Sequence, residues 1–404
     1  MWYAGLDWAD DHHDVVVIDE AARQVASKRV AHTKAGLEEL TSLLKSIAGP
    51  SFQEQLACIV ETNRGLLITA LLEAGFTVYP VNPKAIDRRR VASGAKTDRI
   101  DAYLLAKLGR SELADLRPLK PDTPKIAELK ALTRDQDALV QMQTSLVNQL
   151  TACLKAYYPV ALKLFTKLQQ RSTLLFLQTV PTLQAAQAAS QHQLVQVLKQ
   201  AGHPTAEKVT PKIYEALHQP QLTADAITTS TKARLMLVLV GQLLPLVEQI
   251  AAYDKDIKDL FLTHEDRHMF ESLPRAGKRL APRLLAELGD DRDRYADARS
   301  LQALAGTAPV IYQSGNYQKA HRRSACLKPL RNVLYLFAWQ STLSETWAKA
   351  YYQRKRAEGK SHSVAVRALS NLWLRIIFAM WTSKHAYDAT AFEASRQLHA
   401  PRAA

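Results

Sequence analysis

The sequence predicts an α/β domain at the N-terminus, followed by a long helix and a mainly helical C-terminal region. Three observations support this fold class. Short β-rich runs separated by polar, turn-like segments open the chain. From residue 126, apolar side chains recur every three or four positions. Residues 159–260 are rich in Leu, Gln, Ala and Thr with helical spacing.

The 404 residues suffice for two or three domains. A Pro-rich segment, PLKPDTP at 118–124, marks the clearest boundary. We predict domains at 1–117, 118–160, 161–264 and 265–404.

The N-terminal domain alternates strands and helices in a recognisable order. Its predicted strands are 2–8, 13–19, 24–31, 56–62 and 77–83, and its predicted helices are 33–49, 65–76 and 96–108. Three strands, helix, strand, helix, strand and helix is the ribonuclease H-like order, which builds a mixed sheet with helices on its faces.

Four carboxylates stand out in this domain. Asp7 lies inside an apolar strand, and Glu61 closes another. Asp98 and Asp101 lie three apart on a helix and therefore share a face. A carboxylate in an apolar strand is costly to bury unless it is paired or binds a metal. Oxygen-only clusters suit Mg²⁺ or Mn²⁺, so we predict a metal site here.

An alternative explains half of this cluster without a metal. Asp in a first helical turn is favoured by the helix dipole, which accounts for Asp98 and Asp101. It accounts poorly for Asp7 and Glu61.

Charge composition indicates the partner. Lys plus Arg number 53 against 39 Asp plus Glu, a net charge of +14. Such a surplus favours a polyanion, most simply nucleic acid, although a basic enzyme without such a partner also fits. The basic segment 84–110 adds predicted nucleic-acid contacts at Arg88, Arg89, Arg90, Lys96 and Arg99. Its alternative is a solvated charged loop.

Several features bear on location. The three cysteines are far apart and form neither a disulfide framework nor a metal motif by spacing, which fits a reducing cytosol. We expect no signal peptide. The apolar stretch 235–253 is interrupted by Gln242, Pro245 and Glu248, so we expect a buried or amphipathic helix and no membrane span. These features predict a cytoplasmic protein.

Helical spacing from Ile126 to Tyr157 predicts one long amphipathic helix. It could form a coiled coil with a second copy or pack within its own chain, and both alternatives stay open. Residues 272–290 resemble a helix-hairpin-helix element, in which loop amides and a helix N-terminus hold a phosphate, and the early residues of this helix include Lys278, Arg279 and Arg283.

Ser314 precedes Gly315 in the predicted loop 307–323. A Ser-Gly pair is usually just a turn. Cations downstream, Lys319, Arg322 and Arg323, could hold a phosphate against its hydroxyl. No Ser/His/Asp set has recognisable spacing, but metal coordination can activate a nucleophile without a base.

Together, GLDWAD, VETNR, KTDRIDA and the later LAGTAPVIYQSG resemble the transposases of insertion-sequence family one hundred and ten. These are also described as DEDD transposases or bridge-RNA-guided recombinases. The resemblance covers roughly 1–160 and 265–385. The family usually reads Gly-Leu-Ala-Pro where this chain has GTAP at 306–309, a difference that concerns packing more than chemistry.

This resemblance implies specific roles. Asp7, Glu61, Asp98 and Asp101 would be the metal-binding carboxylates of a RuvC-like domain holding two ions, and Ser314 the nucleophile of a C-terminal transposase domain. It implies a composite site, often between protomers of a dimer or tetramer. It also implies a structured non-coding RNA that pairs with target and donor DNA.

The resulting hypothesis is a metal-dependent DNA recombinase that acts through a phosphoserine intermediate. Two rivals stay open. A junction nuclease would use the same carboxylates to activate water, leaving Ser314 as a turn residue. A non-enzymatic nucleic-acid-binding scaffold would use the carboxylates only as cap and surface groups.

Overall fold

The structure, a computed structural model, describes residues 1–82, 86 and 97–390. The chain divides into two compact units, Met1–Pro121 and Asp122–Ala404, and each is described by itself. The predicted finer boundaries near residues 160 and 264 stay predictions.

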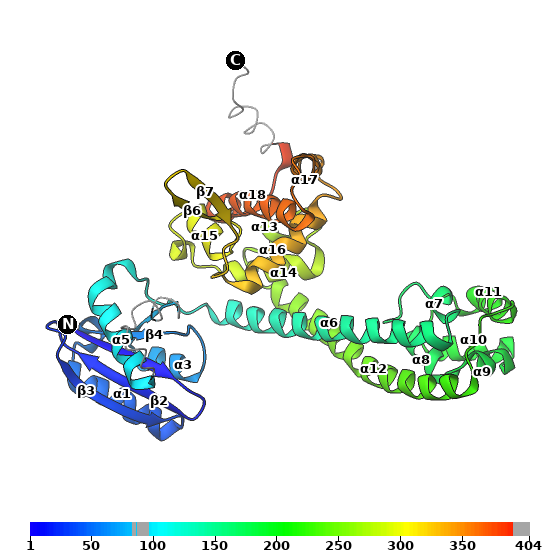
Figure 1. The fold of residues 1–404 in the computed structure, drawn as a ribbon, viewed down its shortest axis with the longest axis horizontal. Helices are drawn as coiled ribbons and strands as arrows, with labels where there is room; N and C mark the ends of the chain where they lie inside the picture. The colour runs from blue at the N-terminus through cyan, green and yellow to red at the C-terminus, as the bar shows by residue number, and fades with distance from the viewer. Residues whose placement is uncertain (83–85, 87–96, 391–404) are drawn as a thin grey trace, which may run out of the picture. The chain divides into compact units, whose positions relative to one another are not determined.

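The first unit is built on a five-stranded sheet with the order β3-β2-β1-β4-β5 (Figure 1). Its strands are β1 (Trp2–Trp8), β2 (His12–Ile18), β3 (Gln24–Ala31), β4 (Leu56–Val60) and β5 (Thr77–Pro80). β1 and β2 pair antiparallel, as do β2 and β3, whereas β1, β4 and β5 run parallel. The predicted mixed sheet and its element order are confirmed.

Helices cover both faces of this sheet. On one face, α1 (Lys34–Ala48) and α3 (Leu66–Glu73) pack against Ala4, Leu6 and their neighbours in a closed apolar core. The short α2 (Phe52–Gln55) leads into β4. On the other face, α5 (Asp98–Glu112) packs against Tyr3, Ile59 and their neighbours. Strands β1, β2 and β4 are therefore buried on both sides, and polar groups within them need a partner or a function.

The second unit is organised by two long helices. α6 (Pro124–Tyr157) confirms the predicted long helix, and it runs antiparallel to α12 (Ala226–Leu262). A hydrogen bond from Gln136 to Asp254 at 2.9 Å joins them near one end, and the Cys153 thiol lies 3.3 Å from the Lys232 carbonyl oxygen near the other. Within the described residues, this long helix thus packs mainly against its own chain.

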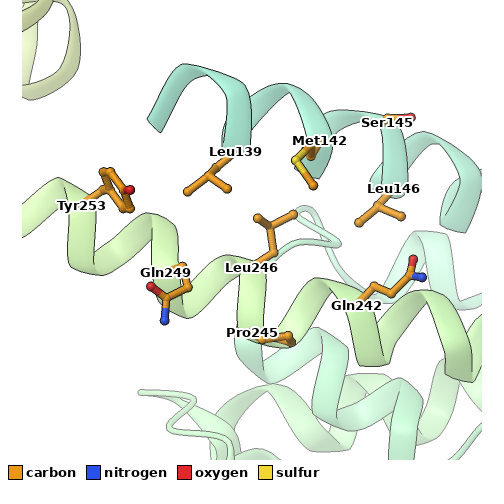
Figure 2. A pocket seen from close by; sticks show the side chains of 9 residues that line it. All are labelled: Leu139, Met142, Ser145, Leu146, Gln242, Pro245, Leu246, Gln249 and Tyr253. Carbon is orange, nitrogen blue, oxygen red and sulfur yellow. The ribbon is translucent and has the colours of Figure 1, made fainter. Parts of the chain in front are cut away.

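The middle of this helix pair is hollowed on one side. Leu139 and Met142 of α6 and Pro245 and Leu246 of α12 line an open, mostly apolar groove (Figure 2). Met142 is more than half exposed. The pair therefore presents apolar surface that the described residues leave uncovered.

Helical cores close both ends of the pair. Small helices pack at the end near Leu150 and Leu243: α7 (Ala161–Leu164), α8 (Arg171–Thr179), α9 (Leu183–Ala188), α10 (Gln191–Gln200) and α11 (Ala206–His218). At the end near Ile126 and Phe261 lie α13 (Arg267–Glu271), α14 (Gly277–Leu288), α15 (Ala298–Leu304), α16 (Lys328–Ser341), α17 (Thr346–Ala357) and α18 (His362–Ser383). α12 and α18 are long and apolar enough to cross a membrane, and both contribute buried side chains to these cores.

The two arginines near the start of α14 pair with carboxylates of the same unit. Arg279 donates two hydrogen bonds to Asp254, at 2.9 and 2.8 Å. Arg283 is buried and donates two to Asp137, at 2.6 and 2.8 Å. These bidentate pairs fix α14 against α6 and α12, so the guanidinium groups are already satisfied by carboxylates.

Candidate functional site

Strand register brings Asp7 and Glu61 to the same level of the sheet. In the parallel pair β1 and β4, Leu6 lies opposite Val60, and each carboxylate is the next residue. Side chains alternate between the faces of a strand. Ala4 and Leu6 belong to the core under α1 and α3, so Asp7 shares the opposite face with Tyr3, which packs against α5.

A close approach of α5 to this face completes the arrangement. A Cβ on Gly5 would lie 1.9 Å from the Ala102 carbonyl oxygen, so only glycine fits between β1 and the helix. α5 begins beside β1, with the Thr97 hydroxyl accepting a hydrogen bond from the Ile100 amide. Asp98 and Asp101 occupy its first turn, and Asp101 is buried.

The electrostatics of Asp7 show that the carboxylates converge. Burial and then the negative charges of Asp101, Glu61, Asp98 and Asp14, in that order, together raise the pKa of Asp7 from 3.8 to about 6. The structure thus brings all four predicted carboxylates into one neighbourhood. A group of like charges around a half-buried carboxyl is unfavourable without a counter-charge, so the arrangement favours the binding of a cation.

Asp14 is a fifth carboxylate that the sequence prediction missed. It lies on β2 directly opposite Asp7 and is buried. The available signal was the alternation of side chains between the two faces of the strand HHDVVVI. It places Asp14 on the same face as Val16 and Ile18, which pack on the α5 side.

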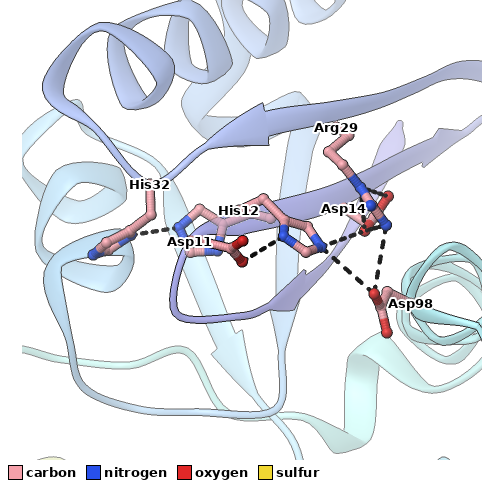
Figure 3. A network of polar contacts seen from close by, with 7 residues as sticks. Asp11, His12, Asp14, Arg29, His32 and Asp98 are labelled. Carbon is pink, nitrogen blue, oxygen red and sulfur yellow. Dashed lines mark hydrogen bonds and ion pairs between the residues drawn. The ribbon is translucent and has the colours of Figure 1, made fainter.

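A polar network links Asp14 to Asp98 (Figure 3). Arg29 of β3 donates to Asp14 at 2.7 Å and lies 3.4 Å from Asp98. The His12 Nε2 atom is 3.5 Å from Asp98 and 3.6 Å from Asp14, while Nδ1 lies 2.6 Å from Asp11. His12, Asp14 and Asp98 each offer a ligand atom within 4.8 Å of the others.

The donor set fits a hard divalent cation. Asp7, Glu61, Asp98 and Asp101 offer only oxygen atoms, the ligands that Mg²⁺ and Mn²⁺ prefer. Their mutual repulsion at Asp7 is the cost that such a cation would relieve.

Ser314 lies in the second unit, on a β-hairpin and not in the predicted loop. β6 (Val310–Ser314) pairs antiparallel with β7 (Tyr317–His321), and Ser314 lies opposite Tyr317. Gly315 has a φ of 55°, which permits the two-residue turn. The missed signal was two β-rich runs separated only by Gly315 and Asn316.

The predicted nucleic-acid-binding residues fall into two groups. Lys319 is exposed on β7, Arg322 and Arg323 follow that strand, and Arg99 is exposed at the start of α5. Arg88, Arg89, Arg90 and Lys96 lie outside the described residues.

Comparison with known proteins identifies the family. A model of DEDD transposases of the IS110 type matches residues 4–159, and a model described as "Transposase IS116/IS110/IS902 family" matches residues 267–353. The chain is 31% identical to the mini-circle putative transposase for IS117 of Streptomyces coelicolor, over 96% of each chain. The chain belongs to the IS110 family of transposases.

Two further relatives agree with this assignment. The transposase is 25% identical to an uncharacterized 43.6 kDa protein of the insertion element IS110 from Streptomyces coelicolor, over 96% of this chain and 95% of that one. It is 22% identical to the transposase for insertion sequence element IS1111A of Coxiella burnetii, over 96% and 91%. The first family match spans the sheet with its carboxylates, and the second spans the Ser314 hairpin.

Proposed function

We propose that this transposase cuts and rejoins DNA strands through a covalent phosphoserine. Asp7, Glu61, Asp98 and Asp101 hold Mg²⁺ or Mn²⁺, two ions per site. The observation that carries the proposal is the gathering of carboxylates around Asp7, whose pKa is raised to about 6 by burial and then by these like charges. When bound, the cations supply positive charge to the scissile phosphate and to its entering and leaving oxygens.

The chemical step is a transesterification. The Ser314 Oγ atom forms a bond to phosphorus, and the bond from phosphorus to one deoxyribose oxygen breaks. The serine proton ends on that oxygen as a hydroxyl group. The phosphodiester is conserved as a serine ester, so a hydroxyl of another strand reverses the step without ATP. Exposure of Ser314 at the end of β6, on the same face as the pair of Tyr312 with Lys319, supports this role.

A trapped adduct tests the proposal. The full chain is expressed with its native flanking DNA, purified under denaturing conditions, and assayed for covalently attached DNA. We expect the adduct in the parent and in Ser324→Ala, a control serine exposed ten positions along. We expect none in Ser314→Ala or Asp7→Asn. Undiminished strand cleavage in Ser314→Ala would instead establish hydrolysis by water, as in a junction nuclease. Binding without cleavage or adduct in the parent would indicate a scaffold.

We also propose that a structured non-coding RNA accompanies the donor and target DNA. The family resemblance and the net charge of +14 support this partner. Sequencing the nucleic acid that co-purifies under native conditions tests it. One discrete RNA transcribed beside the gene is expected, whereas a random sample of cellular RNA would contradict guidance.

A homo-oligomer is the remaining proposed partner. The uncovered groove between α6 and α12, with Met142 more than half exposed, favours contact with a second copy. Light scattering measures the mass. We expect a dimer or tetramer that Met142→Glu shifts toward the monomer, and a monomeric parent would refute the assembly.

A further inference from the structure

The Ser314 hairpin has two chemically different faces. Residues paired across an antiparallel ribbon share a face, and successive pairs alternate. Three pairs share the Ser314 face: Ser314 with Tyr317, Tyr312 with Lys319, and Val310 with His321. The opposite face carries Ile311 with Ala320 and Gln313 with Gln318. The candidate nucleophile thus shares its face with two tyrosines, a lysine and a histidine.

The exposure of these tyrosines is unusual within this chain. All fourteen tyrosines lie among the described residues, and only Tyr312 and Tyr317 are exposed, each with 57% of its surface accessible to solvent. The ribbon is a two-stranded sheet with no third strand among the described residues. A two-stranded hairpin is marginally stable alone, and exposed aromatic rings add nothing to a core. Their placement therefore suggests a contact made outside the chain.

The surroundings favour a polyanion over an apolar partner. No acidic residue stands between Asp297 and Glu345, whereas six lysines and arginines do. Burial and then the like charges of Arg322 and Arg331 lower the pKa of Arg367, which places the three guanidinium groups near one another. None of the three forms an ion pair with a carboxylate of the described residues. This cationic group adjoins the base of the ribbon, since Arg322 directly follows β7.

We propose that the Ser314 face of this ribbon is a stacking platform for unpaired DNA bases. Tyr317 and Tyr312 stack on bases beside the phosphodiester that Ser314 attacks, and Lys319 and Arg322 contact the neighbouring phosphates. This inference rests on the proposed recombinase function. Every base has a π-face, so aromatic stacking tolerates any DNA sequence. An enzyme whose DNA sites are selected by a guide RNA requires such tolerance.

The spacing along the ribbon suits this role. Ser314 and Tyr312 are two residues apart on one strand, about 6.6 Å, which corresponds to about two base steps along DNA. Tyr317 is directly opposite Ser314, with Cβ atoms expected about 5 Å apart. A strand lying along this face could therefore bring a phosphate to Ser314 while its flanking bases meet the two rings. The tyrosines are positioning residues that fix where the hydroxyl meets the backbone.

Photocrosslinking and binding test the platform. The full-length protein is mixed, in EDTA so that no strand is cut, with a short thymidine oligonucleotide containing 5-iodouracil. Irradiation followed by peptide mapping should place the crosslink on Tyr312 or Tyr317. Fluorescence anisotropy should show about fivefold to tenfold weaker binding for Tyr317→Ala and for Tyr312→Ala, with unchanged melting temperatures. Tyr317→Phe, which keeps the ring, should bind within about twofold of the parent.

Ile311→Ala is the matched control, because Ile311 is equally exposed but lies on the opposite face. It should bind like the parent. Parental affinity in both tyrosine-to-alanine variants, or crosslinks confined to other segments, would overturn the platform. Equal losses in Tyr317→Phe and Tyr317→Ala would also overturn it, since the hydroxyl would then be the contacting group. If these results overturn the platform but the Ser314 adduct still forms, the proposed recombinase function is unaffected. If the parent protein does not bind DNA at all, both the platform and the recombinase function are refuted.

Discussion

Replacing Asp7 with Asn tests the carboxylate cluster through stability as well as activity. Asp7 is half-buried, and burial together with the charges of Asp101, Glu61 and two further Asp side chains raises its pKa from 3.8 to about 6. Without any screening by solvent, that pKa difference corresponds to a destabilisation of about 3 kcal/mol by the ionised carboxylate. Because water screens a half-exposed group, we expect Asp7→Asn to stabilise the metal-free protein by about 1–2 kcal/mol near neutral pH.

The pH dependence of this gain has a definite sign. The folded-state pKa of Asp7 is raised, so the folded protein binds the proton more tightly than the unfolded chain. The cost of the ionised carboxylate is fully present above about pH 6, declines as the pH falls, and vanishes below about pH 4. The stability advantage of Asp7→Asn should therefore shrink toward zero over the same interval.

Urea unfolding in EDTA measures the effect, and thermal shift with excess Mg²⁺ complements it. The parent should gain melting temperature with Mg²⁺, while Asp7→Asn should gain less. Asp225→Asn is the control: hydrogen bonds from Thr228 lower the pKa of that helix-capping Asp, so its replacement should bring no gain. The reasoning is refuted if Asp7→Asn is less stable than the parent in EDTA near neutral pH.

Two further predictions concern the scaffold. Gly5→Ala places a Cβ 1.9 Å from the Ala102 carbonyl oxygen and should destabilise the first unit by about 3 kcal/mol in urea unfolding, whereas Gly241→Ala, in open space on a helix, should stabilise slightly. Equal effects of the two would contradict the close packing. Arg134→Met leaves the fully buried Glu287 carboxylate without the two hydrogen bonds of 2.7 and 2.8 Å, and should cost about 3–5 kcal/mol. A melting temperature unchanged from the parent would show that this pair contributes little.

The sheet was predictable because its strands obey simple rules. Residues 2–8 and 24–31 were predicted within the bounds of β1 and β3, since short β-rich runs are set off by polar turns. The convergence of Asp7 with Asp101 followed from strand order plus helix periodicity, both of which are local signals. The register of β1 against β4 places Glu61 beside Asp7. That register is specified by the hydrophobic pattern, because a shift by one residue would turn the buried side chains to the other face.

The remaining features depend on which segments meet in space, which local patterns do not specify. Arg279 and Arg283 lie in a segment that resembles a phosphate-binding element, yet their partners Asp254 and Asp137 lie on helices 25 and 146 positions away. Asp14 was missed because one acidic residue in a valine-rich strand also suits a solvated edge. Only pairing with β1 places it against Asp7. The hairpin at Gly315 differs, because two β-rich runs separated only by Gly315 and Asn316 are a local signal that the sequence itself contains.

A basic chain that gathers carboxylates faces an electrostatic conflict. The net charge of +14 attracts DNA from a distance, but the cluster around Asp7 repels a phosphate at short range, where screening over about 8–10 Å offers little relief. The proposed divalent cations would resolve this conflict by reversing the local sign, so cation binding and DNA binding at the site should strengthen each other by the same factor. Titrating Mg²⁺ into the Ser314→Ala variant with and without DNA measures both sides of that linkage. Asp7→Asn should weaken the coupling, and identical Mg²⁺ affinities with and without DNA would show that the carboxylates and the phosphate do not meet.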